Sequence, residues 1–347
     1  MSNPHSSIEG LSMDRAGTET LCMTYDVALL DLDGVVYIGG DAVPGAVSAL
    51  RTAVAQGMRL SYVTNNAARP PSVVREHLLA LGLTLTDDDV VTSSQAAASL
   101  LATHLPLGSL VAAVGGAGVA EALRTKGFRV VDLDDSGVQA VVMGYGPDVS
   151  WRDLAGAAFA IQAGAQFIAT NTDRTIPTAR GIAPGNGMLV QAVIEATGVT
   201  PQIAGKPQPT LFSEAVTRAN AKRALVVGDR LDTDIEGAVN AGLDSLLVLT
   251  GVTSAREAVL APARMRPTYV ADDLKALMEV APMPVAFEAG WICGGWSAHV
   301  VHERSGPSVQ VKPHNSLESP RSIDAVRAAC AAAAASADPV LAVVGLP

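Results

Sequence analysis

The fold is decided by the stretch Val27-Ala-Leu-Leu-Asp31-Leu-Asp33-Gly34, in which an apolar run meets two carboxylates and a glycine. Short apolar runs that stop at an Asp-Gly pair are typical of buried β-strands. We therefore expect a strand over residues 27–32. The two carboxylates can converge only because the chain leaves the strand at this point, and the glycine lets the backbone approach a ligand closely.

The pair Asp31 and Asp33 suits chemistry in which one carboxylate is a nucleophile and the other a general acid or base. The same pattern also occurs in calcium loops and in ordinary turns. A calcium loop needs further oxygen ligands at alternate positions, followed by a glutamate. Val35, Val36 and Ile38 fill that stretch instead, so calcium is disfavoured, while a turn and a catalytic pair both stay open.

The same pattern of an apolar run and a polar end continues along the chain. Runs at 60–64, 224–228 and 245–249 predict further strands, and helices are predicted at 46–56 and 72–81. Short apolar strands that alternate with helices imply an α/β fold with a parallel sheet covered on both faces. In such sheets, ligands bind at the carboxyl ends of the strands. The polar residues expected at that edge are Asp31, Asp33, Thr64, Asn65 and Asp229.

Composition divides the chain into a leader and three folded units. Residues 1–24 are polar and aperiodic, which predicts a flexible leader, and they lack the basic start and apolar core of a secretory signal. Residues 25–83 and 201–282 carry the pattern of one α/β core domain. The strands and helices expected within 84–200 form an inserted α/β cap domain. Residues 283–347 predict a small α+β C-terminal unit, with a hairpin, an Ala-rich helix and a closing strand.

The overall composition excludes several classes of function. The 347 residues carry a net charge of −10 and are 49% apolar, which is incompatible with wholesale disorder. The acidic balance, without a lysine or arginine cluster, argues against a nucleic-acid partner. No run of about 18 strongly apolar residues exists, so we expect no membrane span. Cys22, Cys293 and Cys330 lie far apart in the sequence, which favours reduced thiols and a cytoplasmic protein.

Three further motifs place polar groups at the ends of expected strands. Thr64-Asn65-Asn66 offers a hydroxyl and backbone N–H groups that suit phosphate oxygens. Lys206, between a glycine and a proline, can act as a point charge for a phosphate. Asp229, within Gly228-Asp-Arg-Leu-Asp-Thr-Asp234, can hold Mg²⁺ with one or two carboxylates and several waters. The ordinary alternatives are a helix N-cap, a solvated lysine and a capping cluster.

Taken together and in this order, the four motifs resemble the haloacid dehalogenase (HAD) superfamily of aspartate-nucleophile phosphatases. Asp31-Leu-Asp-Gly-Val is similar to its first motif and Thr64-Asn-Asn to its second, while Lys206 and Gly228-Asp229…Thr233-Asp234 match the third and fourth. The insertion between the second and third motifs resembles the cap of class IIA members, the NagD-like or p-nitrophenylphosphatase branch. Further stretches similar to that branch are Ala169-Thr-Asn-Thr-Asp173, Pro184-Gly-Asn-Gly187 and Ala196-Thr-Gly198.

The resemblance implies a Rossmann-like HAD core with a parallel sheet and a Mg²⁺-dependent phosphatase that works through an aspartyl-phosphate. Asp31 would be the nucleophile. Asp33 would protonate the leaving alkoxide and then deprotonate the attacking water. Mg²⁺ would bind the carboxylate of Asp31, the backbone carbonyl of Asp33 and the carboxylate of Asp229. A dianionic phosphate cannot enter a nest of carboxylates unless cations offset them, which agrees with this assignment.

The resemblance also assigns the groups around the reacting phosphate. Thr64 and the backbone N–H of Asn65 would hold its oxygens. Lys206 would add positive charge, and Asp234 would orient Lys206 or a metal-bound water. These assignments make an enzyme more plausible than a non-catalytic regulatory binding module, which stays the alternative class.

The cap is expected to choose the substrate. Asn171, Asp173 and Arg174 follow a predicted cap strand and are candidates for substrate contact, with an ordinary turn as the alternative. The preferred substrate is a small phosphomonoester, glycerol 3-phosphate. Other small phosphates, namely 2-phosphoglycolate, pyridoxal phosphate or a nucleotide, stay open. The C-terminal unit resembles a truncated acetyltransferase lobe without a Gly-rich loop for coenzyme A, so we expect a role in packing, homodimer formation or regulation.

Two other features are assigned to structure rather than chemistry. Gly115-Gly-Ala-Gly118 follows a predicted strand, but it lacks the third glycine of a dinucleotide fingerprint, which favours a structural turn. His299 and His302 lie near Cys293 in the sequence and suggest zinc at first sight. A spacing of three residues on a strand points the two rings to opposite faces, so we expect no metal there.

Overall fold

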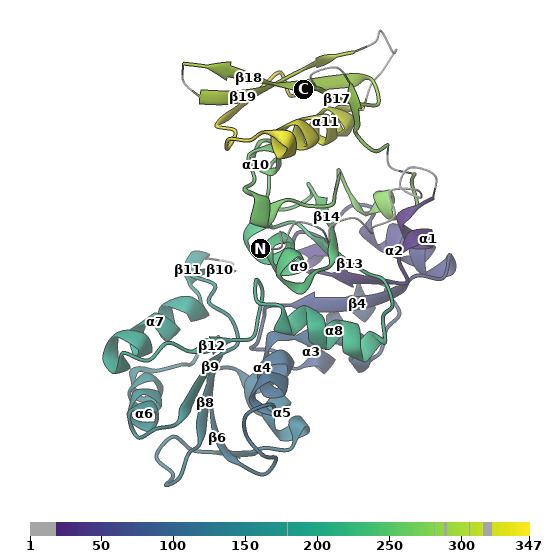
Figure 1. Cartoon of the computed structure of the whole chain (residues 1–347). Coiled ribbons are helices and arrows are strands. Elements are labelled where there is room, and N and C mark those ends of the chain that lie inside the picture. The colour runs from purple at the N-terminus through teal and green to yellow at the C-terminus, as the bar shows by residue number, and fades with distance from the viewer. Residues whose placement is uncertain (1–18, 179, 281, 288–289, 305, 315–320) are drawn as a thin grey trace, which may run out of the picture.

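The structure is a computed structural model that describes residues 19–347 except 179, 281, 288–289, 305 and 315–320. Three bodies follow one another in space, with the core in the middle, the cap at one end and the C-terminal lobe at the other (Figure 1). Each body has its own β-sheet. None of the helices in the described ranges has both the length and the apolar character needed to cross a membrane.

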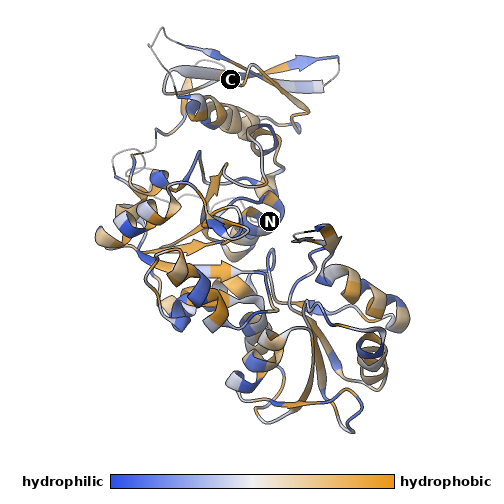
Figure 2. Cartoon of the chain, turned by 180° about the vertical axis from the view of Figure 1, so that it is seen from behind, coloured by the Kyte–Doolittle hydropathy of each residue, from blue (hydrophilic) through white to orange (hydrophobic). Residues whose placement is uncertain are grey.

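Six parallel strands form the core sheet in the order β15-β14-β13-β1-β4-β5. All four residues of β1, at the middle of the sheet, are buried, and the core strands are predominantly apolar (Figure 2). The first strand is shorter than predicted, because β1 ends at Leu30 and the chain turns away from the sheet at Asp31. The bounds are β1 (Val27–Leu30), β4 (Arg59–Thr64), β5 (Val90–Thr92), β13 (Ala224–Gly228), β14 (Asp244–Val248) and β15 (Tyr269–Ala271).

Helices cover the two faces of the core sheet, as a parallel sheet requires. The predicted helices at 46–56 and 72–81 are confirmed to within one residue. The bounds are α2 (Ala46–Ala55), α3 (Pro71–Ala80), α4 (Ser93–Leu101), α8 (Thr210–Ala219), α9 (Glu236–Ala241) and α10 (Ala255–Val259). A short hairpin of β2 (Tyr37–Ile38) and β3 (Asp41–Ala42) follows the Asp-Gly pair. Single helical turns are η1 (Asp87–Asp89), η2 (Leu231–Ile235), η3 (Ala263–Met265) and η4 (Leu274–Leu277).

The cap has a five-stranded parallel sheet in the order β12-β9-β8-β6-β7. Both ends of the inserted segment differ from the predicted limits of 84 and 200. The strand β5 lies after residue 84 yet pairs with β4 in the core sheet, and β12 lies after residue 200 yet pairs with β9 in the cap. The cap elements are β6 (Leu110–Val114), α5 (Ala117–Lys126), β7 (Arg129–Val131), β8 (Ala140–Met143), α6 (Trp151–Gln162), β9 (Gln166–Ala169), β10 (Thr175–Thr178), β11 (Gly181–Pro184), α7 (Asn186–Thr197) and β12 (Gln202–Ile203).

The C-terminal lobe is a five-stranded sheet with one helix, α11, which lies between that sheet and the core (Figure 1). Apolar residues of α11 share one buried cluster with Leu247 and Val270 of the core sheet. Arg327 on α11 donates to the carbonyl of Val270 at 2.9 Å, which ties the helix to the core edge. The bounds are β16 (Val285–Phe287), β17 (Gly290–Cys293), β18 (Trp296–Glu303), β19 (Gly306–Pro313), α11 (Ser322–Ala335) and β20 (Ala342–Val344).

The predicted flexible leader is too long at its C-terminal end. Residues 1–18 lie outside the described range, but α1 (Leu21–Thr24) is a helical turn that belongs to the core. Leu21 and Cys22 are 4% and 5% exposed and pack in the same cluster as Leu30 and Leu50. Two apolar side chains in a polar stretch were enough to anchor this turn to the folded domain.

Candidate active site

The carboxyl ends of three neighbouring core strands bring the predicted polar residues together. Leu30 at the end of β1 pairs in register with Val227 of β13 and with Tyr62 of β4. Parallel strands end at the same edge, so Asp31 follows β1 beside Asp229, which follows β13, while Thr64 closes β4. The sheet register therefore creates the site that the sequence predicted at this edge.

Lys206 is the central cation of this cluster. Its Nζ lies 2.5 Å from Oδ1 of Asp31 and 2.7 Å from Oδ1 of Asp234, and its side chain is 1% exposed. Burial alone would lower the pKa of Lys206, but the carboxylates of Asp234 and Asp31 outweigh it and raise the pKa above its ordinary value. The lysine is therefore charged, and it holds two carboxylates that come from different parts of the chain.

Asn65 fixes Lys206 through the backbone. Its side-chain Oδ1 accepts from the N–H of Lys206 at 2.8 Å, and its Nδ2 donates to the carbonyl of Lys206 at 3.2 Å. This two-point contact joins residues 141 positions apart in the sequence, and the sequence motifs gave no sign of it. The neighbouring Thr64 is 5% exposed, and its Oγ1 accepts from the N–H of Asn66 at 3.1 Å, which shapes the turn after β4.

Asp31, Asp229 and Asp234 form a carboxylate group that fits a hard divalent cation. Each offers one oxygen, and these oxygens lie within 4.8 Å of one another. Oδ2 of Asp229 accepts from the N–H of Val252 at 2.7 Å. Oδ1 of Asp229 is buried and has no hydrogen-bond partner in the described part of the chain. A buried carboxylate oxygen left without a partner is costly, and oxygen ligands of this kind suit Mg²⁺.

The charges within the cluster shift its titration. Burial and the neighbouring Asp234 raise the pKa of Asp229 to about 6. Burial also raises the pKa of Asp31, and Asp234 and Asp229 add to the rise while Lys206 counters it. Without a further cation, the cluster therefore binds protons more tightly than free aspartates do.

Two glycines allow the backbone to press against Asp229. A Cβ at Gly251 would lie 2.0 Å from Oδ2 of Asp229, and one at Gly34 would lie 2.5 Å from the same atom. Gly34 also has a φ of +83°, a conformation that side chains disfavour. A glycine is thus required at position 34 for two reasons, namely its backbone angle and its close approach to Asp229, the candidate metal ligand.

Asp33 lies two residues after Asp31 and is exposed. Desolvation by the surrounding protein raises the pKa of its carboxyl group, while interactions with Arg69, Lys206 and His77 lower it to a smaller extent. A carboxyl group with a raised pKa that solvent can reach is suited to exchange protons with a bound molecule.

The three cap residues predicted to contact substrate lie in different settings. Asn171 is 3% exposed, its Nδ2 donates to the carbonyl of Asn65 at 2.7 Å, and its Oδ1 accepts from the N–H of Asp173. Its amide therefore joins the cap to the core. Asp173 is half-buried, with both oxygens 3.4 Å from Nδ2 of Asn65, and burial raises the pKa of its carboxyl group. Arg174 is exposed to solvent.

Comparison with known proteins identifies the family. Residues 28–129 match the family model of haloacid dehalogenase-like hydrolases, and residues 203–277 match a second HAD-hydrolase-like model. The chain belongs to the HAD-like hydrolases. The D-glycerol 3-phosphate phosphatase of Mycobacterium tuberculosis is 47% identical over 274 residues, which cover 79% of this chain and 77% of that protein. An acid sugar phosphatase of Staphylococcus saprophyticus is 37% identical and covers 74% of this chain and 97% of its own length.

Solved structures give the same result for the fold. The glycerol phosphate phosphatase of Mycobacterium tuberculosis, in complex with magnesium, superposes with a TM-score of 0.83 at 42% identity and covers 94% of this chain and 95% of its own. The p-nitrophenyl phosphatase of Archaeoglobus fulgidus has a TM-score of 0.68 at 30% identity and covers 73% and 98%. These relatives confirm the predicted HAD fold and the class IIA branch.

The glycine turn of residues 115–118 makes structural contacts in this hydrolase, while the expectation of no metal at His299 and His302 stays a prediction. The N–H of Gly118 donates to the carbonyl of Ala68 at 3.1 Å, and a Cβ at Gly116 would lie 2.5 Å from the same carbonyl oxygen, so the glycine turn packs the cap against the core. Among the described residues, the only cluster suited to a metal is the carboxylate group, and His299 and His302 do not join it.

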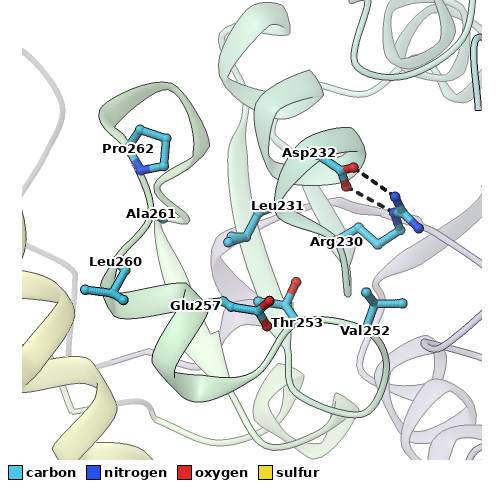
Figure 3. Close-up of a pocket in the computed structure, with 9 residues that line it drawn as sticks. All are labelled: Arg230, Leu231, Asp232, Val252, Thr253, Glu257, Leu260, Ala261 and Pro262. Carbon is cyan, nitrogen blue, oxygen red and sulfur yellow. Dashed lines mark hydrogen bonds and ion pairs between the residues drawn. The ribbon is translucent and has the colours of Figure 1, made fainter. Parts of the chain in front are cut away.

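A pocket of about 390 Å³ lies beside the carboxylate cluster of the hydrolase (Figure 3). Among its lining residues, the guanidinium of Arg230 is paired with Asp232 (Figure 3). The N–H of Thr253 donates to the carbonyl of Asp229 at 3.1 Å. The pocket thus borders the loop that holds the candidate metal ligand. Its lining residues are Arg230, Leu231, Asp232, Val252, Thr253, Glu257, Leu260, Ala261 and Pro262.

Proposed function

We propose that this HAD-like hydrolase is a Mg²⁺-dependent phosphatase that converts glycerol 3-phosphate to glycerol and phosphate. The observation that carries the proposal is the contact of Lys206 with both Asp31 and Asp234, beside the unpartnered oxygen of Asp229. The choice of substrate is supported by the 47% identity to the mycobacterial D-glycerol 3-phosphate phosphatase. A homodimer and a cytoplasmic location remain predictions.

The carboxylates of Asp31 and Asp229 and the backbone carbonyl of Asp33 would hold the metal ion. These are hard oxygen donors, and Oδ1 of Asp229 is free to accept a ligand bond. When bound, Mg²⁺ supplies positive charge that stabilises the ionised form of the carboxylates and the charge of the transferring phosphoryl group.

The chain's own residues perform the transfer in two steps. Asp31 attacks the phosphorus in line, and the bond to the leaving oxygen breaks as an aspartyl-phosphate forms. Asp33 donates its proton to that oxygen, and the raised pKa of its carboxyl group keeps a proton available for this step. Asp33 then takes a proton from the water that hydrolyses the aspartyl-phosphate. Thr64, the N–H of Asn65 and Lys206 hold the phosphoryl oxygens, and Asp234 keeps Lys206 in place.

The test is phosphate release from a panel of phosphomonoesters, with Mg²⁺ and with a chelator. The panel contains glycerol 3-phosphate, 2-phosphoglycolate, pyridoxal phosphate and a nucleoside monophosphate. Wild type is compared with Asp31→Asn and with the matched control Asp88→Asn, whose carboxylate is exposed in η1. We expect release that needs both Mg²⁺ and Asp31, with the highest kcat/KM for glycerol 3-phosphate. A higher kcat/KM for another ester would change the substrate, and no release from any ester would refute the phosphatase.

A further inference from the structure

Tyr37 is held next to Asp33 by the hairpin that follows the Asp-Gly pair. The N–H of Gly34 donates to the carbonyl of Tyr37 at 2.8 Å, and Asp33 and Tyr37 form an isolated β-bridge. The chain therefore folds back on itself, so that a residue four positions after the proposed general acid returns to its side.

The ring of Tyr37 is also fixed from the helix side. It packs on the ring of His77 in α3, with a centroid distance of 4.7 Å and an interplanar angle of 38°. Nε2 of His77 lies 3.4 Å from the carbonyl oxygen of Gly40, in the turn of the same hairpin. Contacts with both the hairpin and the helix restrict the ring to a narrow range of positions, so the phenol is preorganised.

The hydroxyl of Tyr37 has no hydrogen-bond partner among the residues that the structure describes, and the side chain is half-buried. Tyr25 offers a contrast, because its hydroxyl donates to Oδ2 of Asp244 at 2.8 Å. Burial of Tyr37 and the nearby charges of Asp33 and Asp31 raise the pKa of the phenol, while Arg69 partly counters them. The hydroxyl of Tyr37 thus lies within electrostatic reach of Asp33 and Asp31 and has a proton to donate.

We propose that the hydroxyl of Tyr37 donates a hydrogen bond to a hydroxyl group of the leaving alcohol and so selects phosphate esters of polyols. The inference rests on the proposed phosphatase function and adds a specificity-determining residue from the core to it. Asp33 must reach the ester oxygen to protonate it, which places the adjacent carbons of the alcohol next to Asp33 and therefore next to Tyr37. In glycerol 3-phosphate the neighbouring carbon carries a hydroxyl, which supplies the acceptor.

The experiment compares two esters that differ only in the hydroxyl groups of the alcohol. Glycerol 3-phosphate carries the hydroxyls, and n-propyl phosphate has the same carbon chain without them. For Tyr37→Phe we expect kcat/KM to fall about 3- to 10-fold on glycerol 3-phosphate, the value of one neutral hydrogen bond, and to change less than about 2-fold on n-propyl phosphate. The control variant Tyr269→Phe removes a phenol from β15, on the far edge of the core sheet, and should leave both values unchanged.

The outcomes separate this inference from the function on which it rests. An equal loss on both esters would assign Tyr37 a structural role and overturn the inference, and so would the absence of any loss on glycerol 3-phosphate. Wild-type protein that releases phosphate from neither ester would overturn the proposed function, and the inference with it. A selective loss on glycerol 3-phosphate, with an unchanged Tm, would support both.

Discussion

Replacing Lys206 with methionine tests the electrostatic design of the site. In the described part of the chain, Lys206 is the cation in contact with Asp31 and Asp234, at 2.5 and 2.7 Å, and its side chain is 1% exposed. Removing one partner of a buried ion pair costs about 3–5 kcal/mol, because the remaining charge is left uncompensated. At about 3 °C per kcal/mol for a domain of this size, we expect Tm to fall by roughly 12 °C. Turnover should be lost as well.

Thermal unfolding followed by circular dichroism at pH 7.5, with a chelator present, measures this effect without bound metal. The control is Lys275→Met, because Lys275 is paired with Asp273 at 3.3 Å but its side chain is 62% exposed. Exposed pairs contribute about 0–1 kcal/mol, so the control should unfold near the wild-type temperature. A Tm for Lys206→Met within about 2 °C of the control would refute the argument that this lysine compensates buried charge.

The loss of stability in Lys206→Met should depend on pH in a defined direction. Burial and the repulsion from neighbouring carboxylates raise the pKa of Asp31, and without Lys206 no group in contact among the described residues counters this rise, so the native state binds protons more tightly than the unfolded chain. Stability is then lost as the pH rises above about 3.9, the value for an unfolded aspartate. The deficit of Lys206→Met should therefore be smaller at pH 5 than at pH 7.5. An equal deficit at both values would point to lost packing instead of charge.

Three other changes test separate parts of the site. Asp31→Asn should reduce turnover by about 10³-fold or more with little change in Tm, and normal turnover would remove Asp31 as the nucleophile. Asp229→Ala should raise the half-saturating Mg²⁺ concentration by about 100-fold, and in the wild type the Tm gain from Mg²⁺ should shrink as the pH falls through about 6, because protons compete for the same carboxylate. Deleting residues 284–347 uncovers Val259 and Val270, each of which contributes about 1.5–3 kcal/mol when buried, so stability should fall more than turnover does. A stable truncated protein that has lost only turnover would contradict this.

The strands of the core and cap were predictable because their apolar runs are continuous and end at polar residues. The strand predicted at 224–228 agrees with the structure to the residue, and the one predicted at 60–64 agrees to within one residue. The sheet to which a strand belongs is harder to predict, because it depends on which other strand it pairs with. β5 has only three residues, and its pairing of Val90 with Tyr62 of β4 assigned it to the core instead of the cap.

The candidate site was predictable where each residue follows a strand, and less so where its partner is distant. Asp31 and Asp229 come together because β1 and β13 are adjacent, which the alternation of strands and helices makes probable in any parallel sheet. The two hydrogen bonds between Asn65 and Lys206 could not be predicted from the local sequence, because the two residues lie on either side of the inserted cap and meet only in the folded protein. The burial of Asn171 could not be predicted either, because it depends on a contact with Asn65, which is distant in the sequence.

The charge balance of the site explains why a buried lysine and a metal site occur together. Three carboxylates lie within 4.8 Å of one another around a single lysine, so the fully ionised cluster is negative overall and would repel a phosphate dianion. Burial and this excess of negative charge raise the pKa values of Asp31 and Asp229. A bound dication would offset the same excess and favour the ionised form of both carboxylates. Asn65 and Asp234 fix Lys206 in place, so the unpartnered oxygen of Asp229 is a position at which a further positive charge can be accommodated.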